Sequence, residues 1–189
     1  MKVGIYTLGC KVNTYESEFV TSLLENHGYQ ICLFDEVCDI YIINTCTVTN
    51  TSDIKSRKII RRAKRKNPNA CVIAMGCYIQ SDKDNIIDEV DIAIGNKNKS
   101  QIVTLIETYF KDKQKINALD SNFDETFEDM SISKYNNKTR AFVKIQDGCE
   151  NFCSYCIIPF VRGRCRSKEF NKVIEEVTTF TKNGFKEIV

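Results

Sequence analysis

Short apolar runs alternate with segments of helical periodicity through the first hundred residues, and this alternation limits the possible folds more than any other feature. The runs that predict strands lie at 3–8, 29–34, 39–44, 71–75 and 91–94. Helical segments separate them, at 13–27, 52–66, 82–89 and 100–111. Because apolar runs joined by helices are typical of buried parallel strands, we expect an α/β fold, an open parallel sheet with helices on both faces.

Two of these helices carry further local signals. Asn13 and Glu16 have the spacing of a weak capping box, and the helix that they would begin ends at Gly28. The helix at 52–66 places Ser56, Ile59, Ile60 and Ala63 on one face, which we expect to be buried.

Beyond residue 111 the pattern changes. The segment 112–137 is polar and acidic and predicts a linker. A strand is then expected at 141–146, followed by a helix that ends at Gly184 and a further strand that begins at 185. The residues expected on the inward face of this helix are Val173, Ile174, Val177 and Phe180.

Ten cysteines in 189 residues require an explanation. Met1 and Lys2 lead directly into the first strand without the apolar region of a signal peptide, and no apolar run approaches transmembrane length. We therefore expect a cytoplasmic protein with no membrane association and with reduced cysteines, where such a number usually indicates metal binding. The net charge of +2 is small, so any contact with nucleic acid must depend on local patches.

Three of the cysteines follow predicted strands directly. Cys10, Cys46 and Cys77 come just after the runs at 3–8, 39–44 and 71–75. The carboxyl ends of parallel strands share one edge of the sheet, so these thiols are expected to converge there, and a metal cluster is favoured over three unrelated thiols. For Cys32, Cys38 and Cys71, burial as small apolar side chains is the favoured interpretation.

A second group has the spacing C-x3-C-x2-C, formed by Cys149, Cys153 and Cys156. Three thiolates on one loop can hold three irons of a [4Fe–4S] cluster and leave the fourth iron open, whereas zinc sites usually pair cysteines twice. With Tyr155 before the last cysteine, the loop resembles that of radical S-adenosylmethionine enzymes. In that superfamily the cofactor occupies the open iron, and Tyr155 is expected to be a cofactor-binding residue.

The sequence resembles the methylthiotransferase family at segments 7–18, 44–49, 76–80 and 148–159. The resemblance implies an N-terminal cluster domain, a radical S-adenosylmethionine (β/α) barrel and a small RNA-binding domain. It implies two [4Fe–4S] clusters, one held by Cys10, Cys46 and Cys77 and the other by Cys149, Cys153 and Cys156, together with S-adenosylmethionine. The first cluster would carry the sulfur, and reduction at the second would generate a 5′-deoxyadenosyl radical.

The segment GCKVN at 9–13 resembles the branch of this family that acts on N6-threonylcarbamoyladenosine at position 37 of tRNA. The implied activity is the addition of a methylthio group to C2 of that adenine. The resemblance also implies an electron donor such as flavodoxin or ferredoxin, and we expect a monomer. Sibling enzymes that act on isopentenyladenosine in tRNA or on a ribosomal protein remain alternatives.

A dense basic run supports an RNA partner. Eight cations lie between 55 and 66, and no acidic residue after Asp53 interrupts them. Such a helix can neutralise phosphates, although a solvated surface helix is the alternative. The residues expected to contact RNA are Lys55, Arg57, Lys58, Arg61, Arg62, Lys64 and Arg65.

These observations predict an auxiliary-cluster domain at 1–111, a linker at 112–137 and the start of a radical S-adenosylmethionine domain at 138–189. A barrel cannot close on two strands, and the later motifs of the family are absent, so we expect the 189-residue chain to be inactive alone. Two other classes remain, a non-catalytic iron–sulfur or RNA-binding protein and a zinc-binding structural module. Cys165 is expected to be a spare thiol rather than a ligand.

Overall fold

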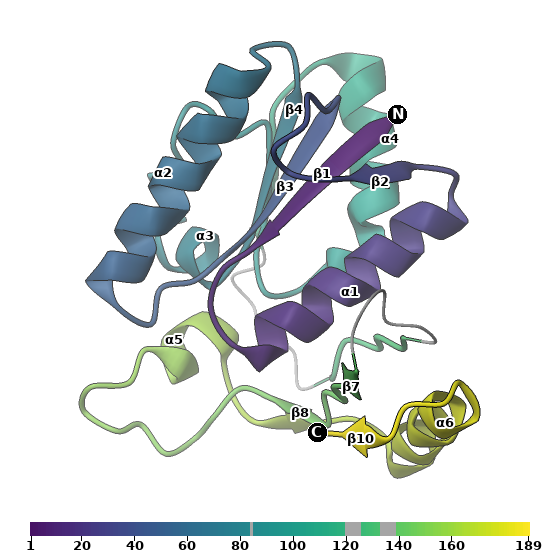
Figure 1. Ribbon diagram of the computed structural model, residues 1–189. Coiled ribbons are helices and arrows are strands. Elements are labelled where there is room, and N and C mark those ends of the chain that lie inside the picture. The colour runs from purple at the N-terminus through teal and green to yellow at the C-terminus, as the bar shows by residue number, and fades with distance from the viewer. Residues whose placement is uncertain (84, 120–125, 133–138) are drawn as a thin grey trace.

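The computed structural model describes residues 1–83, 85–119, 126–132 and 139–189 (Figure 1). Its centre is a parallel six-stranded sheet with the order β2-β1-β3-β4-β5-β6. The strands are β1 (Lys2–Thr7), β2 (Gln30–Cys32), β3 (Ile40–Thr45), β4 (Cys71–Gly76), β5 (Ile92–Ile94) and β6 (Ile116–Ala118). The predicted α/β fold with an open parallel sheet is confirmed.

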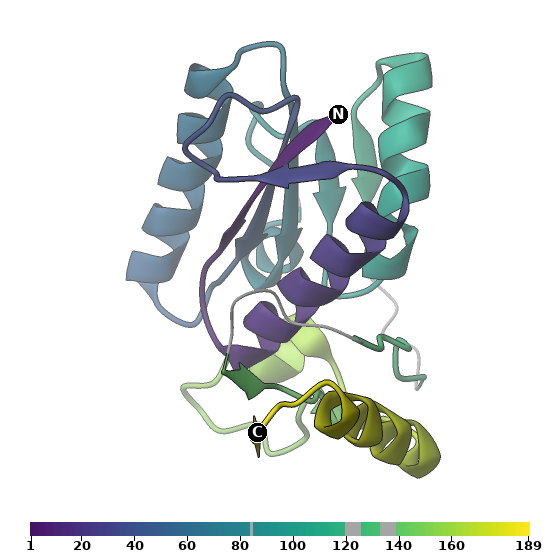
Figure 2. The same cartoon turned by 45° about the vertical axis from the view of Figure 1, so that its right-hand side comes forward.

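Helices cover both faces of this sheet (Figures 1 and 2). On one face lie α1 (Lys11–Asn26) and α4 (Ile102–Asp112), the latter preceded by the 3-10 turn η1 (Lys99–Gln101). On the other face lie α2 (Asn50–Lys66) and the short α3 (Cys77–Ser81). The central strands β3 and β4 are buried along their whole length, as expected for strands that are covered on both sides.

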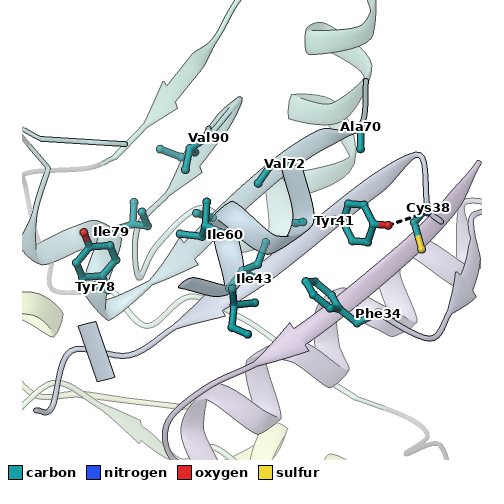
Figure 3. Close-up of a cluster of buried hydrophobic side chains, with 14 residues drawn as sticks. Phe34, Cys38, Tyr41, Ile43, Ile60, Ala70, Val72, Tyr78, Ile79 and Val90 are labelled. Atoms are coloured by element: carbon teal, nitrogen blue, oxygen red, sulfur yellow. Dashed lines mark hydrogen bonds between the residues drawn. The ribbon is translucent and has the colours of Figure 1, made fainter. Parts of the chain in front are cut away.

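Each face has its own apolar core. Figure 3 shows the core under α2, where Ile60 and Ile79 meet Ile43 and Val72 of the sheet. The same core extends to Phe34, and the Tyr41 hydroxyl there accepts a hydrogen bond from the backbone N–H of Cys38 at 3.1 Å. The four residues predicted for the inward face of α2 are all buried, which confirms that face.

Two sequence predictions within the sheet region require correction. The helix expected at 82–89 is absent from the described residues of that segment, which form two turns closed by Asn85 N–H to Asp82 O and by Val90 N–H to Ile87 O. These turns pack Ile86 and Ile87 against the core under α2. Strand β6 was not predicted, and it lies within the segment 112–137 that was expected to be linker.

The residues from 139 onward form a smaller unit beneath the sheet (Figures 1 and 2). Strands β7 and β10 pair in parallel, and the chain between them contains β8, α5, β9 and α6. Strands β8 and β9 pair antiparallel on either side of α5. The elements are β7 (Arg140–Ala141), β8 (Gln146–Asp147), α5 (Ile158–Arg162), β9 (Arg166–Ser167), α6 (Phe170–Lys182) and β10 (Glu187–Ile188).

The single strand expected at 141–146 is therefore two short strands with an irregular segment between them. Lys144, in the irregular segment, turns its buried ammonium toward Glu16 and Asp147. The inward face of α6 also differs from the prediction, because Ile174 is 48% exposed while Glu176 is buried. Buried charges thus shape this unit in a way that hydrophobic periodicity does not predict.

Candidate metal centre

Cys10, Cys46 and Cys77 lie at the carboxyl ends of three neighbouring strands, as the sequence predicted. Cys10 precedes α1, Cys46 follows β3, and Cys77 is the first residue of α3 after β4. Since β1, β3 and β4 are adjacent in the sheet, the three thiols belong to one edge. Cys10 is exposed, whereas Cys46 and Cys77 are buried.

Glycines beside these cysteines allow close packing. Gly9 has a φ of +101°, and a Cβ added there would lie 2.9 Å from Cys46 Cβ, so the backbone before Cys10 packs directly on Cys46. Gly76, with a φ of +96°, would meet Asn44 Oδ1 at 2.6 Å. The left-handed backbone and the lack of space both require glycine at these positions.

Two buried asparagines hold the loops that carry the cysteines. The Asn13 amide donates to Leu8 O at 2.8 Å and to Thr45 O at 3.0 Å, which joins the segments before Cys10 and Cys46. Asn96 lies 3.6 Å from the Cys77 sulfur and donates to Val161 O at 2.7 Å. The expected capping box is wrong, because Asn13 and Glu16 are buried inside α1, which begins at Lys11.

Arg162 connects this edge to the residues after 139. Its guanidinium donates to Asn13 Oδ1 at 3.0 Å, to Glu16 Oε1 at 2.9 Å and to Asp147 Oδ1 at 3.0 Å. Burial raises the pKa of the Cys77 thiol, and the positive charge of Arg162 opposes this shift. A buried cation therefore favours negative charge at Cys77.

Among the described residues, the buried charges that pair around Arg162 are unequal in number. Glu16 and Asp147 provide two carboxylates, whereas Lys99, Lys144, Arg162 and Arg166 provide four cations. Burial alone would raise the pKa of Glu16, but the cations Arg162, Lys144 and Lys99 hold it well below its usual range. The excess positive charge makes this edge suitable for an anionic group.

The C-x3-C-x2-C segment forms a loop between β8 and α5. Cys149 N–H donates to Gly163 O at 3.1 Å, and Cys156 N–H donates to Cys153 O at 2.9 Å. Cys153 is exposed, and the Tyr155 side chain is 91% exposed. An added Cβ at Gly148, with a φ of +80°, would overlap the backbone of Gly163 and Arg164, so glycine is required where the loop begins.

The loop and the sheet edge are neighbours, since α5 packs beside α3 and the start of α1 (Figures 1 and 2). Asn96 contacts both Cys77 and Val161, and Arg162 contacts Asn13 and Asp147, so the contacts pass from one cysteine group toward the other. Within the residues that the structure describes, no three His, Cys, Asp or Glu side chains are grouped closely enough to hold a single metal ion. Each cysteine group offers three thiols, which is the donor set of an iron–sulfur cluster with one open iron.

The basic helix α2 is less uniform than its sequence. Acids from distant segments pair with several of its cations, Asp35 with Arg62, Glu89 with Arg61 at 3.4 Å and Asp91 with Lys64 at 2.8 Å. Arg57 lies over the Tyr78 ring at 5.6 Å. The basic run has no acidic residue beside it in the sequence, but folding brings acids from other segments to it. Lys55, Lys58 and Arg65 are exposed and form no ion pair in the described parts of the chain.

Four cysteines belong to neither group. Cys38 and Cys71 are buried, and Cys32 is half-buried with its sulfur 2.7 Å from that of Cys38. Cys165 is exposed.

Sequence reasoning did not select Asn13, Glu16, Asn96 or Arg162 as site residues. A signal for the first two existed, because Asn13, Glu16, Val20 and Leu24 share the helical spacing of the inward face of α1.

Comparison with known proteins gives consistent matches. Residues 2–95 match the family described as "Uncharacterized protein family UPF0004". The chain is 42% identical over 190 residues to the threonylcarbamoyladenosine tRNA methylthiotransferase MtaB of Bacillus subtilis (strain 168), an alignment that covers 99% of this chain and 42% of that protein. The protein of the same name from Aquifex aeolicus (strain VF5) is 37% identical over 192 residues, with coverage of 100% and 47%.

A relative with a different name is more distant. The tRNA-2-methylthio-N(6)-dimethylallyladenosine synthase of Christiangramia forsetii (strain DSM 17595 / CGMCC 1.15422 / KT0803) is 33% identical over 194 residues, with 99% of this chain and 40% of that protein covered. The chain thus spans less than half the length of these curated relatives. No helix in the described part of the chain combines the length and apolar character that crossing a bilayer requires.

Proposed function

This chain belongs to the methylthiotransferase family, and on that premise we propose that it takes part in adding a methylthio group to C2 of N6-threonylcarbamoyladenosine at position 37 of tRNA. The observation that carries the proposal is the placement of Cys10, Cys46 and Cys77 after three adjacent parallel strands. The higher identity to relatives named for threonylcarbamoyladenosine, 42% and 37% against 33%, favours this nucleoside over the dimethylallyl one.

In this proposal each cysteine group holds one [4Fe–4S] cluster. Cys149, Cys153 and Cys156 are the ligands of the cluster that binds S-adenosylmethionine, and Cys10, Cys46 and Cys77 are the ligands of the auxiliary cluster. The two clusters, when bound, would supply the reduction of S-adenosylmethionine and the transfer of sulfur, which protein side chains cannot perform. Tyr155 is exposed on the loop, available to a cofactor at the open iron.

The chain itself contributes ligands, position and charge. The contacts of Arg162 with Asn13 and Asp147 keep the loop and the sheet edge in one arrangement. The buried cations around Glu16 favour a negatively charged cluster at Cys77, because the net charge near a cluster helps to set its potential.

Anaerobic reconstitution of the purified chain with iron and sulfide tests this assignment. About eight irons per chain support two clusters, about four support one, and zinc alone would exclude the radical mechanism in favour of a zinc module. Replacing Cys46 by Ala should remove about four irons, whereas replacing the exposed Cys165 by Ala should remove none.

The substrate is tested separately, in cells that lack the gene for this chain. Mass spectrometry of tRNA nucleosides should then show loss of the 2-methylthio derivative of N6-threonylcarbamoyladenosine. Loss of the isopentenyladenosine derivative instead, or of a methylthio group on a ribosomal protein, would assign the chain to a sibling activity.

The remaining parts of the proposal concern partners. Flavodoxin or ferredoxin would supply electrons to a cytoplasmic monomer. The 189-residue chain alone is expected to lack methylthio transfer, and transfer by the purified, reconstituted chain would contradict this expectation. Cluster assembly without cleavage of S-adenosylmethionine would favour the non-catalytic alternative.

A further inference from the structure

A basic groove lies between α2 and the carboxyl end of β1. Its volume is about 350 Å³, at the lower end of the range for pockets that hold small ligands. The groove is lined by the aromatic and apolar side chains of Tyr6, Leu8 and Ile59. It is also lined by four cations of α2, which are Lys55, Lys58, Arg62 and Arg65.

The four cations form one row along α2. Their spacings of three, four and three residues place them on the same face of the helix, over a length of about 15 Å. Arg62 pairs with Asp35, which also meets Lys66 near the end of α2. Lys55, Lys58 and Arg65 are exposed and make no ion pair among the residues described, so their charges are available to a ligand.

The apolar side of the groove is firmly held. Ile59 is buried in the core under α2, and the half-buried Tyr6 ring packs edge-on against Phe34 with the ring centroids 5.1 Å apart. An aromatic ring beside a row of cations is the combination with which proteins bind single-stranded nucleic acid, because bases stack on the ring while phosphates meet the cations.

The groove also ends beside the candidate metal centre. Leu8 comes two residues before Cys10. Ser56, the neighbour of Lys55, binds the backbone of Cys46 at both N–H and C=O, at 3.3 Å and 3.2 Å. A strand that lies along the row of cations would therefore be directed toward Cys10 and Cys46.

We propose that this groove binds single-stranded RNA, with its phosphates against Lys55, Lys58 and Arg65 and one base against Tyr6. The identity of the RNA rests on the proposed function, whereas the groove rests on its own geometry. This assignment narrows the seven cations expected from the sequence to three principal contacts and adds Tyr6, which the sequence analysis did not select.

The test measures binding of a fluorescent, unmodified tRNA anticodon stem-loop to the 189-residue chain by anisotropy, over a range of salt concentrations. Each phosphate contact to a single strand contributes about 0.7 to the slope of log affinity against log salt. The triple variant K55A/K58A/R65A should therefore lose about 2 from the slope.

A matched pair of single variants separates the groove from general charge. Lys58→Ala and Arg61→Ala each remove one exposed cation from the same helix. Lys58 lines the groove, whereas Arg61 lies outside it and pairs with Glu89. Lys58→Ala should weaken binding and lower the slope, while Arg61→Ala should do neither. Equal losses from the two variants would overturn the proposal.

A second pair of variants tests the contact between Tyr6 and a base. Tyr6→Leu should weaken RNA binding by about tenfold, because an apolar side chain without a ring cannot stack on a base. Tyr6→Phe should bind as the wild type does. Unchanged thermal unfolding of each variant confirms that the fold is retained, and Phe and Leu variants of equal affinity would overturn the stacking contact.

Competition identifies the ligand class. ATP or poly-glutamate that displaces the RNA at lower concentration than unlabelled stem-loop would assign the groove to a free nucleotide or an acidic peptide and would overturn the proposal. RNA binding that is unaffected by the groove variants overturns the groove but leaves the proposed function standing, since clusters and nucleosides are measured separately. A wild-type chain that binds no RNA at low salt overturns the groove even if both clusters assemble.

Discussion

The two faces of the sheet and the contact between α1 and the residues after 139 are held together by different forces. Under α2, and under α1 and α4, large clusters of apolar side chains fill the space between helices and sheet. Between α1 and the residues after 139, a small apolar cluster around Tyr15 and Phe180 is accompanied by buried charges. These are Glu16, Lys99, Lys144, Asp147, Arg162, Arg166, Lys168 and Glu176.

The two kinds of contact should lose stability differently when a residue is substituted. Apolar packing loses stability in proportion to the atoms that are removed. A buried ion pair is balanced against desolvation, so removal of one partner leaves an uncompensated charge and costs more than the pair contributed. The sheet should therefore tolerate small changes, whereas the contact that positions the C-x3-C-x2-C loop should depend on single charged groups.

The largest effect is expected from Glu16→Gln. Glu16 accepts from Lys144 at 2.8 Å and Arg162 at 2.9 Å, and the variant leaves these buried cations without the Glu16 carboxylate. The expected loss is about 3–5 kcal/mol, concentrated in residues 139–189. Hydrogen exchange should show faster exchange there while β3 and β4 stay protected. Glu25→Gln, an exposed change on the same helix, is the control. If Glu16→Gln lowered protection uniformly along the chain, the two regions would not differ in how they are stabilised.

Ile42→Ala should act on the other region. Ile42 is fully buried in β3, and the deletion of its methyl groups should cost about 2–5 kcal/mol of unfolding free energy. Because β3 lies at the centre of the sheet, chemical denaturation should show a lower midpoint for the whole chain. A loss confined to residues 139–189 would contradict the distinction between the two regions.

Acidification should weaken the ion pairs of Glu16 with the cations around it. The pKa of Glu16 is held well below its usual range because the attraction of Arg162, Lys144 and Lys99 outweighs the effect of burial. Such a carboxyl stabilises the folded state fully above its unfolded pKa of about 4.3, and this contribution is lost as the pH falls through the lower folded pKa. The protection of amides in 139–189, measured relative to their intrinsic exchange rates at each pH, should fall below about pH 4. The substitution Glu16→Gln should flatten this dependence, and an equal pH response in both proteins would exclude Glu16 as its source.

The smallest effect is expected at the start of α2. Thr49 accepts a hydrogen bond from Ser52 N–H at 3.2 Å as the N-cap of this helix. Thr49→Ala should cost about 1 kcal/mol in chemical denaturation, and Thr49→Ser should restore most of it. A cost as large as that of Glu16→Gln would show that the sheet region also depends on single polar contacts.

The sequence alone determined the parallel sheet, the buried face of α2 and the order of strands and cysteines along the chain. These features follow from local periodicity, since a strand or a helix is specified by residues only a few positions apart. The placement of Cys10, Cys46 and Cys77 at one edge followed from that order, because parallel strands share a carboxyl edge.

The partners of the charged residues were decided only by the tertiary structure. Arg162 meets Glu16 across 146 positions, and Asp35 meets Arg62 across 27. The periodicity of α6 predicted an inward Ile174, but the inward position belongs to Glu176, which accepts from Lys168 at 2.5 Å and from Tyr15 at 2.9 Å. Charges on distant segments pair only after folding brings them together, so no local pattern in the chain encodes which carboxylate each cation will meet.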